Sequence, residues 1–136
     1  MKKDIPQHKV EEMAIAIVPR ADHELVEDDL WDTYILNLKS DSIRNVLVSS
    51  QGYGELDGDN MKTTVLRHFF EEIEGEQVKQ IEPIQTKLFA LTNEYWVSFQ
   101  HDGYMYDKKY VFVKGSIHRD NFTTIPFIGK RGVMIR

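Results

Sequence analysis

The chain has 136 residues, no cysteine and a formal net charge of −5 at pH 7. This length is typical of one domain with a substantial core, so we expect a single domain over residues 1–136. The absence of cysteine excludes disulfides, thiolate metal sites and cysteine nucleophiles. No apolar run approaches the roughly 20 residues that a membrane-spanning helix needs, and none follows the lysines at the amino terminus. We therefore expect a cytoplasmic protein without a membrane partner.

Charge is distributed unevenly along the chain. Residues 1–100 contain 10 Lys/Arg and 19 Asp/Glu, whereas residues 101–136 contain 7 and 3. The acidic excess repels a nucleic-acid backbone and so disfavours nucleic acid as a partner. Scattered surface cations usually serve solubility. The cations of residues 101–136 are nevertheless compatible with a small basic patch, formed by Lys114, Arg119, Lys130, Arg131 and Arg136.

The first strongly patterned segments predict strands. Residues 13–18 alternate in side-chain size before Pro19, which lacks a backbone donor and ends the strand. Residues 33–38 and 43–49 also alternate, and Ser40-Asp41-Ser42 between them supplies side chains that stabilise turns. We interpret these two segments as a β-hairpin.

The glycine-rich run SSQGYGELDGDN, residues 49–60, raises the question of a phosphate or calcium site. A P-loop needs Gly-x4-Gly-Lys-Ser/Thr, and this spacing is absent here. An EF-hand begun at Asp57 has Asp59 at its third position, but Met61, Lys62 and His68 replace the other required residues. We interpret the run as a hairpin connection in which glycine and Asp/Asn adopt unusual dihedral angles.

Residues 63–74 fit two structures. Val65, Leu66, Phe69, Phe70 and Ile73 lie on one face of a helix that would end at Gly75. The β-branched residues at 63–65 and the turn pattern at 73–76 favour a strand instead. We prefer the strand.

Asp102-Gly103 separates two alternating runs, residues 94–101 and 104–113, and this dipeptide suits a two-residue hairpin turn. The turn pairs His101 with Tyr104, Phe99 with Tyr106, and Tyr95 with Tyr110, which makes one face a ladder of aromatic rings. Lys108 falls on this aromatic face and indicates either a bulge or a sheet edge.

The opposite face of the hairpin carries Trp96, Ser98, Gln100, Asp107 and Lys109. Trp96 is expected opposite Lys109, where a cation–π contact on a partly exposed surface fits both side chains. Short strands at spacings of about ten residues then predict an all-β or mainly β fold. We expect an immunoglobulin-like antiparallel β-sandwich of about seven or eight strands, with at most short helices.

Several segments together resemble a family of small, functionally uncharacterised bacterial proteins. They are Trp31-x-x-Tyr34-Ile35-Leu36-Asn37, residues 45–54 (NVLVSSQGYG), Arg67-His68-Phe69, Ile81-Glu82-Pro83-Ile84 and Asn93-Glu94-Tyr95-Trp96-Val97. Some members of that family are described as a phenylalanyl-tRNA synthetase chain. The resemblance covers most of the chain, implies a sandwich-like fold and does not imply an activity.

Candidate catalytic and metal-binding groups do not form a convincing set. Ser116, His118 and Asp120 stand at alternate positions, but strand neighbours on one face are about 6.6 Å apart, too far for a serine and its base. The five histidines have no metal-ligand spacing, and pairing His68 with His101 would supply only two ligands. We therefore assign no catalytic, cofactor-binding or metal-binding residue.

The sequence favours a non-catalytic interaction module that binds a protein partner. The candidate interaction surface is Trp96, Tyr106, Asp107 and Lys109, since aromatic and charged residues together are typical of contact sites. Exposed sheet edges are also compatible with a homodimer. Two alternatives stay open: a tRNA- or synthetase-associated protein, as the family description implies, and an enzyme of unknown reaction.

Overall fold

Strands form where β-branched and aromatic residues alternate with polar ones. The computed structural model describes residues 10–21 and 26–136, so residues 1–9, on which the expectation about the amino terminus rests, lie outside it. Ten strands occur in the described residues: β1 (Met13–Pro19), β2 (Leu30–Asn37), β3 (Ile43–Leu56), β4 (Asp59–Lys62), β5 (Leu66–Ile73), β6 (Gln77–Gln85), β7 (Thr92–His101), β8 (Tyr104–Phe112), β9 (Thr123–Ile125) and β10 (Lys130–Ile135).

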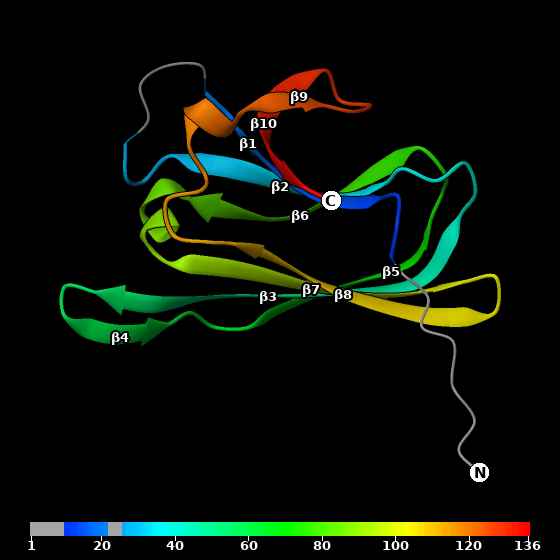
Figure 1. Cartoon of the computed structure of the whole chain (residues 1–136), viewed down its shortest axis with the longest axis horizontal. Coiled ribbons are helices and arrows are strands. Elements are labelled where there is room, and N and C mark those ends of the chain that lie inside the picture. The colour runs from blue at the N-terminus through cyan, green and yellow to red at the C-terminus, as the bar shows by residue number, and fades with distance from the viewer. Residues whose placement is uncertain (1–9, 22–25) are drawn as a thin grey trace, which may run out of the picture.

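The strands form two antiparallel sheets, seen as the upper and lower layers in Figure 1. The first, here the β1 sheet, has the order β6-β2-β1-β10-β9. The second, the β3 sheet, has the order β4-β3-β7-β8, and β5 also pairs with β3. The predicted all-β sandwich is confirmed, with ten strands in the described residues in place of seven or eight, because β4, β9 and β10 were not anticipated.

Helical structure in the described residues is limited to two short 3₁₀ helices, η1 (Thr86–Ala90) and η2 (Arg119–Asn121). No helix within these residues has the length and apolar character needed to cross a membrane. Residues 63–74, which fitted both a helix and a strand, contain β5, so the preferred strand is confirmed.

The interpretation of residues 33–38 and 43–49 as a hairpin is wrong. β2 pairs with β1 and β6, whereas β3 pairs with β4, β5 and β7, so the connection between them crosses from one sheet to the other. Turn-forming residues such as Ser40 and Asp41 suit a crossing as well as a hairpin, because both reverse the backbone.

A buried amide fixes this crossing. Asn37 is fully buried at the end of β2, and its Nδ2 lies within 2.9–3.1 Å of the carbonyl oxygens of Asp41, Ile73 and Glu74. Its Oδ1 accepts a hydrogen bond from the backbone N–H of Lys39. One side chain thus joins the β2–β3 crossing to the turn that leads from β5 to β6.

The glycine-rich run is strand for most of its length. β3 continues to Leu56, and the chain reverses only at Asp57 and Gly58, whose φ values are 52° and 84°. The expected hairpin turn is therefore confirmed at two residues and wrong for the residues before them. Gly52 lies within the strand, and glycine suits this position because a Cβ there would come 2.8 Å from Oδ1 of Asn93.

The main core lies between the sheets and is built from inward-facing aliphatic and aromatic side chains. Trp31 is 2% exposed, donates from Nε1 to Oγ1 of Thr86 at 2.8 Å, and meets the rings of Phe89 and Phe122 edge-on. A second, smaller cluster covers the other face of β1 through Ala14, Ala16, Val18, Leu36 and Ile125. Both faces of β1 are therefore buried.

Replacing Asn37 by alanine tests the amide at the crossing. Asn37→Ala leaves buried carbonyl groups without a donor, each costing about 1–3 kcal/mol, so we expect the free energy of unfolding to fall by at least about 2 kcal/mol. Asn60→Ala on the exposed strand β4 is the control and should change it by less than about 0.5 kcal/mol. Urea unfolding measures both. Equal losses in the two variants would show that the Asn37 amide has no special role.

Candidate functional site

The β7–β8 hairpin has the register that the Asp-Gly turn predicted. His101 pairs with Tyr104, Phe99 with Tyr106, Trp96 with Lys109, and Tyr95 with Tyr110. Asp102 and Gly103 at the turn both have positive φ, as this turn type requires. β8 is the edge strand of the β3 sheet, and no register shift interrupts its pairing with β7, so Lys108 marks an edge and no bulge.

Three of the four candidate interaction residues share the outer face of the β3 sheet. Alternation and pairing place Trp96, Asp107 and Lys109 on the side away from the core. Trp96 is 43% exposed, and Nζ of Lys109 lies 5.5 Å from the centre of its indole ring. The expected cation–π pair is therefore confirmed.

Tyr106 does not belong to this face. Its ring stacks on Phe99, with centres 5.1 Å apart and planes 9° apart, and the side chain packs against the main core. Tyr106 was included because it lies in the same hairpin. Strict alternation along β8 puts it on the opposite side of the sheet from its neighbour Asp107.

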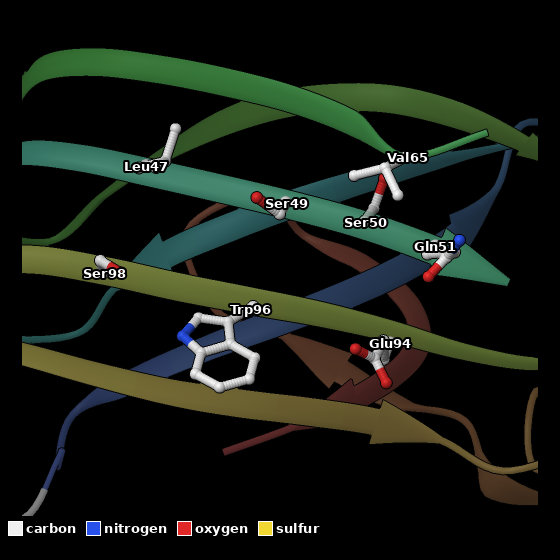
Figure 2. Close-up of a pocket in the computed structure, with 8 residues that line it drawn as sticks. All are labelled: Leu47, Ser49, Ser50, Gln51, Val65, Glu94, Trp96 and Ser98. Carbon is white, nitrogen blue, oxygen red and sulfur yellow. The ribbon is translucent and has the colours of Figure 1, made fainter.

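The outer face is hollowed beside Trp96. The hollow has a volume of about 330 Å³, and Figure 2 shows the Trp96 indole lying along one side of it, with Leu47 and Ser49 of β3 across from it. The other residues that line the hollow are Ser50, Gln51, Val65, Glu94 and Ser98. Further exposed apolar side chains on this face are Leu47 (39%), Phe69 (58%) and Met105 (64%).

A second group of polar side chains lies between the sheets and was not anticipated. Ser50 of β3 donates a hydrogen bond from Oγ to Oε1 of Glu82, and Nε2 of His68 on β5 lies 3.3 Å from the same oxygen. Glu82 belongs to β6, an edge strand of the other sheet. The cluster Ser50–His68–Glu82 therefore connects the two layers.

A register shift in β6 explains why Glu82 points inward. Trp31 pairs with Ile84 and Thr33 with Ile81, so two residues of β6 stand opposite one residue of β2. Ile81 and Ile84 are both buried, and simple alternation would put them on opposite faces. Such a bulge re-aims side chains, and Pro83 within the strand was the available signal, because proline in a strand indicates an edge or a bulge.

Tyr95 lies close to this cluster on β7. Its side chain is 3% exposed, and burial raises the pKa of its hydroxyl far above the ordinary value, with the negative charge of Glu82 adding to the effect. The phenol therefore stays neutral throughout the physiological range.

His68 and His101, which were considered as a pair of metal ligands, do not share a site in the described residues. His68 contacts Glu82, whereas Nε2 of His101 lies 2.8 Å from Oδ2 of Asp41, so the two histidines have separate partners. One oxygen of Asp41, one oxygen of Asp102 and a ring nitrogen of His101 lie within 4.8 Å of one another, but both carboxylates are exposed. His8 and His23 lie outside the described residues.

Ser116, His118 and Asp120 belong to the loop that contains η2, as a polar connector does. Nδ1 of His118 accepts a hydrogen bond from the backbone N–H of Asp120, so the ring caps the short helix. Oγ of Ser116 is buried and has no hydrogen-bond partner among the described residues, which excludes its activation by His118 in this geometry.

Part of the basic carboxyl-terminal set comes together around a different hollow. Arg119, Lys130 and Arg131 line it with Arg20 from the end of β1, and its volume is about 520 Å³. Lys114 and Arg136 do not line it. Arg20 is bound to Asp32 at 2.8 Å, Arg131 donates to the carbonyl oxygen of Phe122, and the guanidinium carbon of Arg119 lies 5.9 Å from the centre of the Phe122 ring, so at least three of the four cations already have partners.

The protein is thus an antiparallel β-sandwich that exposes Trp96 on the outer face of the β3 sheet and contains the polar cluster Ser50–His68–Glu82 between its sheets. The chain matches no family model, no curated protein and no solved structure.

The contact between Asp41 and His101 predicts a pH effect. The hydrogen bond from His101 is the main cause that lowers the pKa of Asp41 below its ordinary value of 3.8. A carboxyl group with a lowered pKa in the folded state stabilises the fold above its unfolded pKa, and this contribution is lost as pH falls through the folded pKa.

We expect His101→Leu, which removes the hydrogen-bond donor, to return the pKa of Asp41 toward the ordinary value, measured by NMR titration of the side-chain carboxyl carbon. The difference in unfolding free energy between the two proteins should be present at pH 7 and shrink below the pKa of Asp41. An unchanged Asp41 titration in the variant would contradict this assignment.

Proposed function

We propose that the protein is a non-catalytic interaction module that binds a protein partner through the outer face of the β3 sheet. The observation that carries this proposal is the exposure of Trp96 beside a hollow of about 330 Å³. Trp96 is absent from both core clusters, so the sandwich closes its interior without it. A large aromatic side chain that the core does not need is a strong candidate for a contact residue.

The chemistry of the face supports a protein partner. Exposed Leu47, Phe69 and Met105 lie on the same face as Trp96 along paired strands, and serine and glutamine side chains lie between them. Protein interfaces typically contain a few apolar or aromatic side chains surrounded by polar residues, and these few side chains supply most of the binding free energy. The expected occupant is an apolar side chain of the partner, seated in the hollow against the indole ring.

The face is favoured over the edge of the same sheet. β8 is an edge strand, and Lys108 on its inner side lies with Nζ 5.1 Å from the centre of the Tyr110 ring. Charged side chains that point inward at an edge oppose the addition of another strand. A homodimer formed by pairing two β8 strands is therefore disfavoured, and side-chain contact across the outer face is preferred.

An RNA-linked role is the second candidate, and the hollow of Arg20, Arg119, Lys130 and Arg131 is the observation that favours it. Cations grouped around one concave surface suit phosphate groups. The net charge of −5 and the ion pair of Arg20 with Asp32 weaken this candidate, so protein binding is preferred.

We place the protein in the cytoplasm as part of the same proposal, since the chain contains no cysteine.

The two tryptophans should differ sharply in their contribution to stability. Trp31→Ala removes a buried side chain and is expected to cost about 3–5 kcal/mol of unfolding free energy. Trp96→Ala removes an exposed ring and one cation–π contact, so the expected cost is less than about 1 kcal/mol. Urea unfolding followed by circular dichroism measures both. A loss near that of Trp31→Ala would make Trp96 a structural residue and remove the basis of the proposed face.

Binding is tested by affinity capture from native lysate with tagged wild-type protein, Trp96→Ala and Val26→Ala. Val26 is 61% exposed on a connector outside the β3 sheet, which makes it a matched apolar control. We expect a specific protein that the wild type and Val26→Ala capture equally and that Trp96→Ala loses by about tenfold or more, as for a central aromatic anchor. Purified partner should then shield Trp96 from acrylamide quenching.

Equal capture by Trp96→Ala and the wild type would contradict the proposal. Recovery of tRNA that moderate salt releases and that Lys130→Ala weakens would favour the RNA-linked candidate instead.

A further inference from the structure

The sandwich has an inner pocket on the side where β5 and β6 are neighbouring edges of the two sheets. Its volume is about 160 Å³. Leu66, Ile84 and Leu88 supply apolar walls, while Ser50, Glu82 and Tyr95 supply polar groups. A cavity of this volume holds a ligand of about six non-hydrogen atoms, such as benzene in an engineered apolar cavity of similar size.

The pocket contains an incompletely paired carboxylate. Oε1 of Glu82 accepts from Ser50 and lies 3.3 Å from Nε2 of His68, whereas Oε2 is buried and has no hydrogen-bond partner among the described residues. A buried carboxylate oxygen without a donor is costly, so such groups usually have a cation or a hydrogen-bond donor beside them. Oε2 can therefore accept a hydrogen bond, while Nε2 of His68, which is also buried without a hydrogen-bond partner among the described residues, lies beside the other oxygen.

The side chains around the pocket indicate which kind of ligand group would suit the Glu82 carboxylate. Glu82 and Glu94 line the pocket, although Glu94 also borders the outer hollow. No lysine or arginine is among its described lining residues, and the basic side chain beside the carboxylate is His68, at Oε1. The serine hydroxyl fixes the carboxylate in place, and the bulge in β6 holds its backbone. A cationic donor with an apolar body complements both the carboxylate and the aliphatic walls.

We propose that this pocket binds a primary ammonium group on a short aliphatic chain, with the ammonium at the Glu82 carboxylate and the chain against Leu66, Ile84 and Leu88. Two sources share this chemistry: a free alkylamine and the lysine side chain of a protein. The inference does not depend on the outer face around Trp96. Either proposal can fail while the other holds.

The test is a titration of isotope-labelled full-length protein with n-pentylamine at pH 7, where the amine is protonated. We expect saturable shifts at the amides of Gly52 and Leu66 and none at the indole N–H of Trp96. 1-Pentanol, a neutral molecule of the same length, should bind about tenfold more weakly because it lacks the charge-assisted hydrogen bond.

Two variants separate the carboxylate from general effects. Glu82→Gln keeps the side-chain shape and should weaken n-pentylamine binding by about tenfold or more, whereas Glu71→Gln on the exposed part of β5 should leave it unchanged. Leu66→Lys attaches an ammonium group to the protein itself, at an exposed position of the pocket rim. This group should compete for the Glu82 carboxylate and abolish binding of n-pentylamine. Circular dichroism and thermal unfolding verify that each variant is folded.

Nα-acetyl-lysine N-methylamide distinguishes the two sources. Binding at least as tight as that of n-pentylamine supports a lysine side chain, and preference for n-pentylamine supports a free amine. Absence of saturable binding by both ammonium probes, or equal binding of n-pentylamine to wild type and Glu82→Gln, would overturn the proposal. Loss of binding in Trp96→Ala without any change in Glu82→Gln would also overturn it, because the ligand would then occupy the outer face.

Discussion

The side chain of Asn37 holds together the two places where the chain passes between the sheets at one end of the sandwich. Its amide contacts carbonyl groups of the β2–β3 crossing and of the β5–β6 turn. The two segments approach so closely that a Cβ on Gly75 would lie 2.3 Å from the carbonyl oxygen of Ser40. Because β5 and β6 leave this point in different sheets, the amide also sets how these edges face each other.

Local patterns predicted the elements whose pairing partner is adjacent in sequence. The Asp102-Gly103 turn determines the β7–β8 register because two residues with positive φ allow only a tight reversal. The β2–β3 crossing was misread because its turn residues do not reveal which sheet the chain enters next. That choice depends on the burial of Asn37 against residues about 36 positions away, which no local pattern contains. The glycines at 52 and 54 lie in a strand, not in the turn, for two different reasons: a Cβ at Gly52 would meet Oδ1 of Asn93, and Gly54 has a φ of 147°, which other residues rarely adopt.

The candidate site divides in the same way. Alternation from the hairpin turn was enough to place Trp96, Asp107 and Lys109 on one face, and the same rule, applied strictly, puts Tyr106 on the other. The inner cluster was hidden because a bulge breaks alternation, and a simple two-residue period assigns Glu82 to the outside. Pro83 marked the irregularity but gave no information on which neighbour would turn inward.

The two proposed sites are neighbours that share Ser50, Gln51 and Glu94 among their lining residues, but the groups that define them, Trp96 and Glu82, lie on the outer and the inner side of the sandwich. Along β3, Ser49 lines the outer hollow, whereas Ser50 binds Glu82 on the inside. Along β7, Trp96 is exposed, whereas its neighbour Tyr95 is buried. Paired strands hold both sets of side chains rigidly, so neither site requires the ordering of a flexible loop. The outer face offers an aromatic anchor in a shallow hollow, and the inner pocket offers a fixed carboxylate among aliphatic walls; these suit different ligands even though adjacent residues build both.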